Sequence, residues 1–317
     1  MLVTAVVPVF NAMSFLPLTV PTLLAAARRT GQVELRFVDN GSTDGSLEYL
    51  ESLAIDNARV LRFEPKSIGG VRNFGARAAP GRFLSFIDAD CCIPEDYFET
   101  AVEIIETTGS AATGCSVEIP QPAHWIEATW HAMHFVGRDR DVSYLNSANF
   151  FVRREAFDRV GGFREDLRTG EDAEIGQRIV AAGLRIREST RVQSIHLGNP
   201  KSLAAFHRRM VWHGLGMFGT VNRRSLDKPT TMMFLHLAAT IIGLAVILWA
   251  PWGFLERISL AIAFQLVIPA LTVFYRIRQT RRLPRLDRAL LLYWLYYWAR
   301  ARALFAILSG QVHWYWK

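Results

Sequence analysis

Two pairs of carboxylates have a spacing that suits chemistry. Asp88 and Asp90 directly follow the apolar run 83–87, which predicts a buried strand. Carboxylates two residues apart can share one hard cation such as Mg²⁺ or Mn²⁺, which substrate phosphates often complete. An Asx turn closing the strand is the alternative, and for an isolated pair it is the commoner role. A metal site is therefore expected here only if other signals join it.

The second pair is Glu171 and Asp172, at the start of a segment with the acidic opening of a helix. A carboxylate at a helix start that faces a cleft can accept a proton from an incoming hydroxyl. Ordinary helix capping is the alternative, and the local sequence favours it. Both pairs need a scaffold that could bring them into one site.

The first 200 residues alternate between strand-like and helix-like segments. Strands are predicted at 3–9, 33–38, 60–63 and 83–87, with helices at 14–29, 46–53 and 70–79 between them. This alternation predicts an α/β fold with a mostly parallel sheet and helices on both faces. Ligands of such sheets lie at the carboxyl ends of the strands, where the sequence places Phe10, Asn11, Asp39 and the Asp88–Asp90 pair.

Charge divides the chain near residue 200. Residues 1–200 carry 20 Lys+Arg and 26 Asp+Glu, a balance of −6, and residues 201–317 carry 16 and 3, a balance of +13, which together give the net charge of +7. Hydrophobic residues make up 50% of the 317, which excludes a disordered or collagen-like chain. The 3 Cys and the absence of a secretory signal predict no disulfide framework and a largely cytosolic chain.

Two uncharged runs lie in the basic half, residues 229–255 with 27 members and residues 258–275 with 18. A membrane-spanning helix needs about 20 apolar residues, and two buried helices of a soluble protein are the alternative. Basic residues flank the pair on both sides, so the positive-inside rule predicts that both flanks face the cytosol. Their expected partners are anionic lipid headgroups rather than nucleic acid.

A third apolar stretch, 289–299, has only 11 residues, with three Tyr and two Trp that suit the headgroup zone. Whether 289–308 lies in the interface or inserts is left open. The expected protein is multi-pass in the cytoplasmic membrane with its catalytic domain in the cytosol. Its parts are a catalytic domain (1–200), a basic amphipathic juxtamembrane segment (201–228), two transmembrane helices (229–275), and a basic loop with an aromatic interfacial helix (276–317).

Five segments together resemble the family 2 glycosyltransferases. They are VVPVFN (6–11), VDNGSTDGS (38–46), GGVRNFGARAAPGRFLSFIDAD (69–90), NFFVRREAFDRVGGFRED (149–166) and GEDAEIGQRIVAAG (170–183). The resemblance is collinear over about residues 3–196. It implies a GT-A fold, a nucleotide-diphospho-sugar donor with uridine as the preferred base, a divalent metal (Mn²⁺ or Mg²⁺) and inversion at the anomeric carbon.

The resemblance also implies roles for individual residues on the donor side. The base-binding groups would be Pro8, Phe10, Asn11 and Asp39, with Asp39 next to the uracil or ribose. The ribose and diphosphate would lie along Gly69, Arg72, Asn73 and Asp88.

On the reacting side, the resemblance implies that Asp90 holds the metal and that Asp172 is the catalytic base. Asn149 and Glu171 would touch the donor sugar or the acceptor. His196 follows the last predicted strand. The resemblance implies a place for it near the metal or the diphosphate, and a purely structural role is the alternative.

Processive members of this family carry a Q-x-x-R-W motif, and this chain has FHRRMVW at 206–212 instead. The departure favours transfer of a single sugar, and the membrane segment favours a lipid-linked acceptor in polysaccharide or glycolipid biosynthesis. A nucleotidyltransferase is disfavoured because no glycine-rich basic loop follows the first strand. A catalytically silent membrane scaffold that binds nucleotide sugar remains the main alternative. No feature of the sequence predicts an oligomeric state.

Overall fold

The computed structural model describes residues 2–53, 56–64, 67–77, 79–115, 117–135, 137–216 and 228–311. The chain forms two compact units: unit 1 is Met1–Gln121 with Gly137–Asn199, and unit 2 is Pro122–Val136 with Pro200–Lys317. After the segment 137–199 of unit 1, the chain enters unit 2 again at Pro200. The segment 122–136, expected in the first domain, belongs to unit 2, because its aromatic side chains pack against the C-terminal helices. Residues 217–227, the end of the expected juxtamembrane segment, lie outside the described residues.

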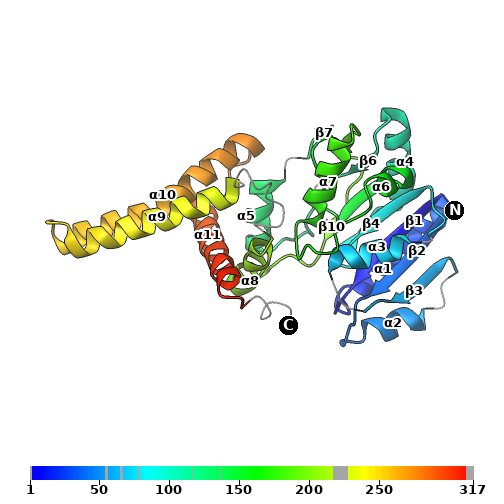
Figure 1. The fold of residues 1–317 in the computed structure, drawn as a ribbon, viewed down its shortest axis with the longest axis horizontal. Coiled ribbons are helices and arrows are strands. Elements are labelled where there is room, and N and C mark those ends of the chain that lie inside the picture. The colour runs from blue at the N-terminus through cyan, green and yellow to red at the C-terminus, as the bar shows by residue number, and fades with distance from the viewer. Residues whose placement is uncertain are drawn as a thin grey trace. The chain divides into compact units, whose positions relative to one another are not determined.

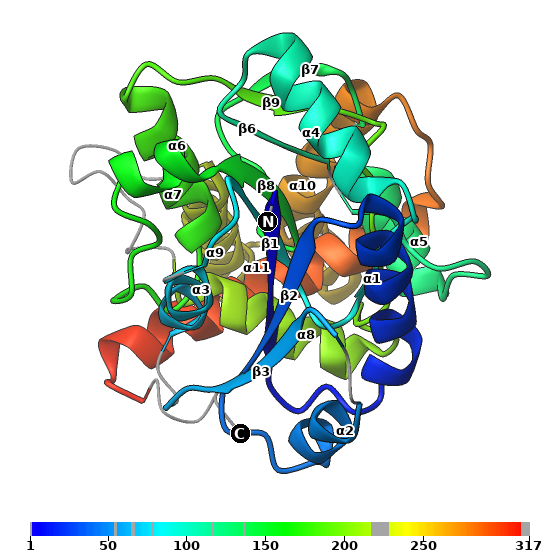
Figure 2. The ribbon, with the colours of Figure 1, turned by 90° about the vertical axis from the view of Figure 1, so that its right-hand side faces the viewer.

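Unit 1 is built on a sheet of eight described strands in the order β3-β2-β1-β4-β8-β6-β9-β7 (Figure 2). The half that carries the predicted strands is parallel and comprises β1 (Val3–Val9), β2 (Val33–Asp39), β3 (Ala58–Arg62) and β4 (Phe83–Ile87). The other half continues through β8 (Asn149–Arg153), antiparallel to β4, into β6 (Ala112–Gly114), β9 (Ile186–Glu188) and β7 (Arg140–Val142).

Every residue of β1 and β2 is buried, as expected for parallel strands covered on both faces. One face packs against α1 (Leu16–Thr30) and α4 (Tyr97–Thr108), with α2 (Ser46–Ser52) at its edge. The other face packs against α3 (Ile68–Ala76), α6 (Arg154–Arg159) and α7 (Glu171–Ala181). Figure 2 shows these two helical layers on either side of the strands. The expected α/β fold is confirmed, with strand β4 at its predicted bounds.

A small ladder adds to the carboxyl end of β4. Strand β5 (Cys91–Cys92) pairs antiparallel with β10 (Ile195–His196), and the register places His196 opposite Cys91. Chain segments about 100 residues apart in sequence therefore meet next to Asp90.

Unit 2 is helical. Its described elements are α5 (Trp125–His134), α8 (Leu203–Gly214), α9 (Lys228–Trp249), α10 (Phe254–Thr280) and α11 (Leu286–Leu308). Helices α9 and α10 lie side by side (Figure 1) and contain the two expected spans. Both are long and apolar enough to cross a membrane, and most of their apolar windows are not buried within the protein.

The aromatic stretch of α11 differs from the expected headgroup contact. Tyr293 and Tyr297 are only 2% exposed, because both rings pack inside unit 2. Tyr293 meets Trp130 of α5, and Tyr297 stacks on His236 of α9. In this structure the two buried tyrosines join helices to one another.

Candidate active site

The loops after β1 and β2 are tied to each other. The Asn11 backbone N–H donates to Ser42 Oγ at 3.0 Å, and Asn11 Oδ1 accepts from the Thr43 N–H at 2.9 Å. Asn11 has a left-handed backbone (φ 48°), which asparagine tolerates better than most residues. Phe10 is left 52% exposed at the carboxyl end of β1. Its ring is thus the part of this double loop most open to a planar ligand.

Asp39 closes the second strand and is 3% exposed. Its carboxylate accepts the backbone N–H groups of Gly41 at 3.0 Å and Ser42 at 3.2 Å. Pro8 is buried within β1. Asp39 and Pro8 shape the predicted base-binding end, whereas Phe10 and Asn11 stand at its surface.

Arg72 is the ionic link between the two carboxylate pairs. It is 2% exposed on α3, and its guanidinium donates to Asp88 Oδ1 and to Glu171 Oε1, both at 2.7 Å. The helix can lie this close to the sheet because Gly75 of α3 faces Val6 and Val38 with no room for a Cβ. The arginine therefore joins the carboxyl end of β4 to the first turn of α7.

Asp172 follows Glu171 in that first turn and is half-buried. Its pKa is raised to about 6, chiefly by burial and secondly by the charge of Glu171, against the lowering effects of the Ala173 N–H and Arg72. Helix α7 starts at Gly170, whose φ of 84° suits glycine. A carboxylate with this pKa is ionised at neutral pH and can accept a proton.

Asp90 directly precedes β5 and lies beside the β5–β10 ladder. His196 Nε2 is 3.3 Å from Asp90 Oδ2, and the His196 side chain is 7% exposed. Asp90, Cys91 and His196 each offer a ligand atom, and the three atoms lie within 4.8 Å of one another. The two residues expected near the metal are thus brought together, with a sulfur beside them.

Asn73 and Gly69 hold a loop. The Asn73 side-chain amide donates to the Phe163 carbonyl at 2.8 Å and to Glu165 at 2.9 Å, and its oxygen accepts the Phe163 N–H. A Cβ on Gly69 would lie 2.5 Å from the Arg164 carbonyl oxygen. Both residues hold the loop at 163–165 against α3. This is a structural role, and their expected contact with the diphosphate stays a prediction.

Asn149 is fully buried, and both ends of its amide are used within unit 1. Its oxygen accepts the Tyr97 hydroxyl at 2.8 Å, and its nitrogen donates to the Val192 carbonyl at 2.9 Å. The expected contact between Asn149 and a sugar is not available in this structure, because the side chain is committed to the core.

Sequence comparisons identify the family of the chain. The family described as "Glycosyl transferase family 2" matches residues 4–161, and "Glycosyl transferase family group 2" matches residues 83–278, more than half of the chain. The chain belongs to the family 2 glycosyltransferases. It is therefore a glycosyltransferase, as the resemblance predicts.

Two relatives and one solved structure illustrate this membership. Glycosyltransferase AglE of Haloferax volcanii is 28% identical over 62% of this chain and 67% of its own length. Succinoglycan biosynthesis protein ExoA of Rhizobium meliloti is 28% identical over 67% and 68%. The mannosyltransferase PcManGT of Pyrobaculum calidifontis, in complex with GDP-Man and Mn²⁺, superposes with a TM-score of 0.58 at 18% identity, over 95% of this chain and 86% of that one. The structural likeness shows a shared GT-A fold.

Two residues of this glycosyltransferase site were not predicted from its sequence. Ser147 donates to Glu171 at 3.2 Å from the loop before β8, where no residue pattern marks it. The count of 3 Cys does not single out Cys91, although its position directly after the Asp88–Asp90 pair could have drawn attention to it.

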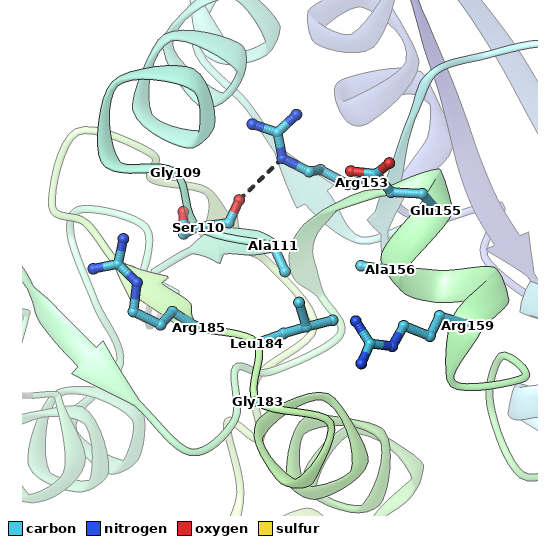
Figure 3. A pocket seen from close by; sticks show the side chains of 10 residues that line it. All are labelled: Gly109, Ser110, Ala111, Arg153, Glu155, Ala156, Arg159, Gly183, Leu184 and Arg185. Carbon is cyan, nitrogen blue, oxygen red and sulfur yellow. Dashed lines mark hydrogen bonds between the residues drawn. The ribbon is translucent and has the colours of Figure 1, made fainter.

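A pocket of about 430 Å³ lies elsewhere in the glycosyltransferase (Figure 3). Arg153 on its wall ends β8 and pairs with Phe83, the first residue of β4, so the pocket is at the opposite edge of the sheet from Asp88. Arg153 donates to the Ser110 carbonyl and Arg159 to the Ala182 carbonyl. None of the predicted site residues lines this pocket.

Proposed function

We propose that this glycosyltransferase moves one sugar from a nucleotide-diphospho-sugar to a hydroxyl of a membrane-associated, lipid-linked acceptor, with inversion at the anomeric carbon. The observation that carries the proposal is the Arg72 bridge between Asp88 and Glu171. It holds the end of β4, where the donor diphosphate is expected, against the helix start that carries Asp172. This supports a single site that would take the donor and carry the base.

In the proposed mechanism, Asp172 accepts the proton of the acceptor hydroxyl as that oxygen attacks the anomeric carbon. The new C–O bond forms as the bond to the diphosphate oxygen breaks on the opposite face, and the nucleotide diphosphate leaves with the electron pair. Phe10 would stack on the base and Asn11 would border it. The buried Arg72 would hold Asp88 and Glu171 in place through its two ion pairs.

The donor set at Asp90 and His196 fits a divalent cation. A carboxylate and an imidazole meet there, and Gly198 faces Asp90 Oδ2 so closely that any Cβ would collide with it. A cation such as Mn²⁺ or Mg²⁺, when bound, would offset the charge on the departing diphosphate. The Mn²⁺ of the similarly folded PcManGT complex supports this assignment.

The acceptor is inferred from unit 2. Helices α9 and α10 could cross a bilayer, and basic residues follow α10 at Arg281, Arg282, Arg285 and Arg288. Such a module would hold the enzyme on the cytoplasmic face of the membrane, where anionic headgroups attract the arginines. ExoA, a relative named for succinoglycan biosynthesis, supports an acceptor in polysaccharide or glycolipid assembly.

The test is donor turnover by the detergent-solubilised chain with a membrane lipid extract. UDP-sugars are expected to be preferred, and the GDP-Man of the PcManGT complex makes GDP-sugars the necessary comparison. We expect metal-dependent release of one nucleotide that requires the extract and is lost in Asp90→Ala. Donor binding without transfer to lipid or water would instead support the silent scaffold.

A further inference from the structure

Cys91 faces the same side of the β5–β10 ladder as His196 and contacts Asp90. In an antiparallel ladder, directly opposite residues project to the same face, and the register pairs Cys91 with His196. Neighbours along a strand project to opposite faces, so Cys92 points the other way. The contacts agree: Cys91 Sγ is 3.9 Å from Asp90 Oδ1, whereas Cys92 Sγ is 3.9 Å from the Leu18 carbonyl oxygen.

The spacing of the three ligand atoms suits a single ion. Oxygen and nitrogen ligands bind divalent transition metals at about 2.0–2.2 Å and thiolate sulfur at about 2.3 Å, so two ligands of one ion lie at most about 4.5 Å apart. The oxygen, nitrogen and sulfur of this cluster are all within 4.8 Å of one another. Side-chain movements of about 1 Å would bring the three atoms to the spacing of about 3.5 Å that tetrahedral coordination needs.

Two of the three residues are buried, and the Asp90 side chain is 21% exposed. Cys91 is 0% exposed and His196 is 6% exposed, and the Leu197 N–H donates to the Asp90 carbonyl at 2.8 Å. Gly198 lies directly beside the Asp90 carboxylate, which is possible because glycine has no Cβ. The strand pairing fixes Cys91 and His196 with respect to one another, and Asp90 is the residue before Cys91 in the chain.

We propose that Cys91 is a third protein ligand of this site and that its sulfur selects a later first-row cation, Co²⁺ or Zn²⁺, over Mg²⁺. Imidazole and thiolate suit these ions, while Mg²⁺ takes oxygen ligands almost exclusively. When the sulfur binds, its S–H proton passes to solvent. The inference rests on the proposed function only in placing the donor's cation at Asp90.

The test uses Co²⁺ alone, without donor or acceptor, titrated into the full detergent-solubilised chain. Sulfur bound to Co²⁺ gives a near-ultraviolet charge-transfer absorption, which oxygen and nitrogen ligands do not give. We expect this band at one equivalent in the native chain and in Cys92→Ser, the matched neighbour, and its loss in Cys91→Ser. Calorimetry should show at least about tenfold weaker Co²⁺ binding by Cys91→Ser with little change for Mg²⁺.

A Cys92→Ser, Cys115→Ser double variant retains Cys91 as the sole cysteine and must keep the band, so the test stands even if Cys91→Ser fails to fold. Co²⁺ binding without a sulfur band in the native chain would overturn the inference. If Asp90→Ala then abolished that binding, the metal role of Asp90 would survive alone. Absence of any Co²⁺ binding by the native chain would overturn both.

Discussion

The two units bury polar side chains in different ways. In unit 1, Arg72 is held between two carboxylates. In unit 2, Thr272 meets the Tyr297 hydroxyl at 2.6 Å, and Arg300 donates to the Thr230 hydroxyl and lies over the Tyr296 ring. Unit 1 thus keeps ionised groups side by side, which is what acid–base chemistry needs. The contacts within unit 2 join helix to helix through hydroxyls and rings, which suits a membrane anchor.

The largest effect is expected at Asp172, the proposed base in unit 1. Asp172→Asn keeps the shape of the side chain but cannot accept a proton, so turnover should fall about 10³-fold, within the range for loss of a general base. Donor affinity should change less than about threefold, because the base acts on the acceptor. Nucleotide release and donor calorimetry measure the two quantities.

Asp166→Asn is the matched control, since this exposed acid pairs with Arg164, two residues away. It should retain near-native turnover. A fully active Asp172→Asn enzyme would remove Asp172 from the mechanism and leave the Arg72 bridge as a structural device.

The next effect tests whether exposed apolar side chains mean different things in the two units. Ile241 on α9 is 68% exposed, and Leu18 on α1 is 60% exposed. If α9 spans a membrane, Ile241→Arg should oppose insertion by about 3 kcal/mol, and part of the protein should leave the membrane fraction. Leu18→Arg adds the same charge in unit 1 and should leave the distribution unchanged. Equal behaviour of the two variants would contradict the anchor.

A smaller effect is expected for the contact between α5 and the C-terminal helices. Trp130 packs against Phe206, Tyr293 and Tyr296, so Trp130→Ala should cost about 2–3 kcal/mol and lower the melting temperature. Trp252→Ala removes an exposed ring between α9 and α10 and is the control. If both variants melted like the native chain, the assignment of 122–136 to unit 2 would need revision.

How much could be predicted also differs between the units. Strands β1 to β4 of unit 1 were predictable, since each is a segment of strand length followed by polar residues. Strands β5 to β10 were not predicted, and five of these six have only two or three residues. The assignment of α5 to unit 2 was not predictable, because a tryptophan such as Trp130 is equally compatible with the core of the first domain and with a contact between helices. The aromatic run of α11 has the composition of an interfacial belt, and only the packing shows that Tyr293 and Tyr297 are internal.

Within the site, the carboxylates were predictable from spacing, but their connections were not. Asn149 opens a strand beside the expected cleft, and no local pattern tells a ligand contact from the buried bonds to Tyr97 and Val192. The position of Cys91 beside His196 depends on a strand pairing between residues about 100 positions apart. Such links come from long-range register, which single-sequence periodicity does not carry.

The smallest expected effect concerns the pH dependence of the reacting pair. Asp172 accepts a proton only when ionised, so the rate should rise with pH through its pKa of about 6 and then level off. Glu171→Gln removes the neighbouring negative charge, which lowers the pKa of Asp172 and should move the acid limb to lower pH. Because burial is the larger cause, the shift should stay below about one pH unit. Glu174→Gln, one turn on and paired with Arg178, should leave the limb in place. If Glu171→Gln left the acid limb unmoved, a group other than Asp172 would be titrating. The neighbouring charges that distinguish unit 1 would then have no influence on the reaction rate.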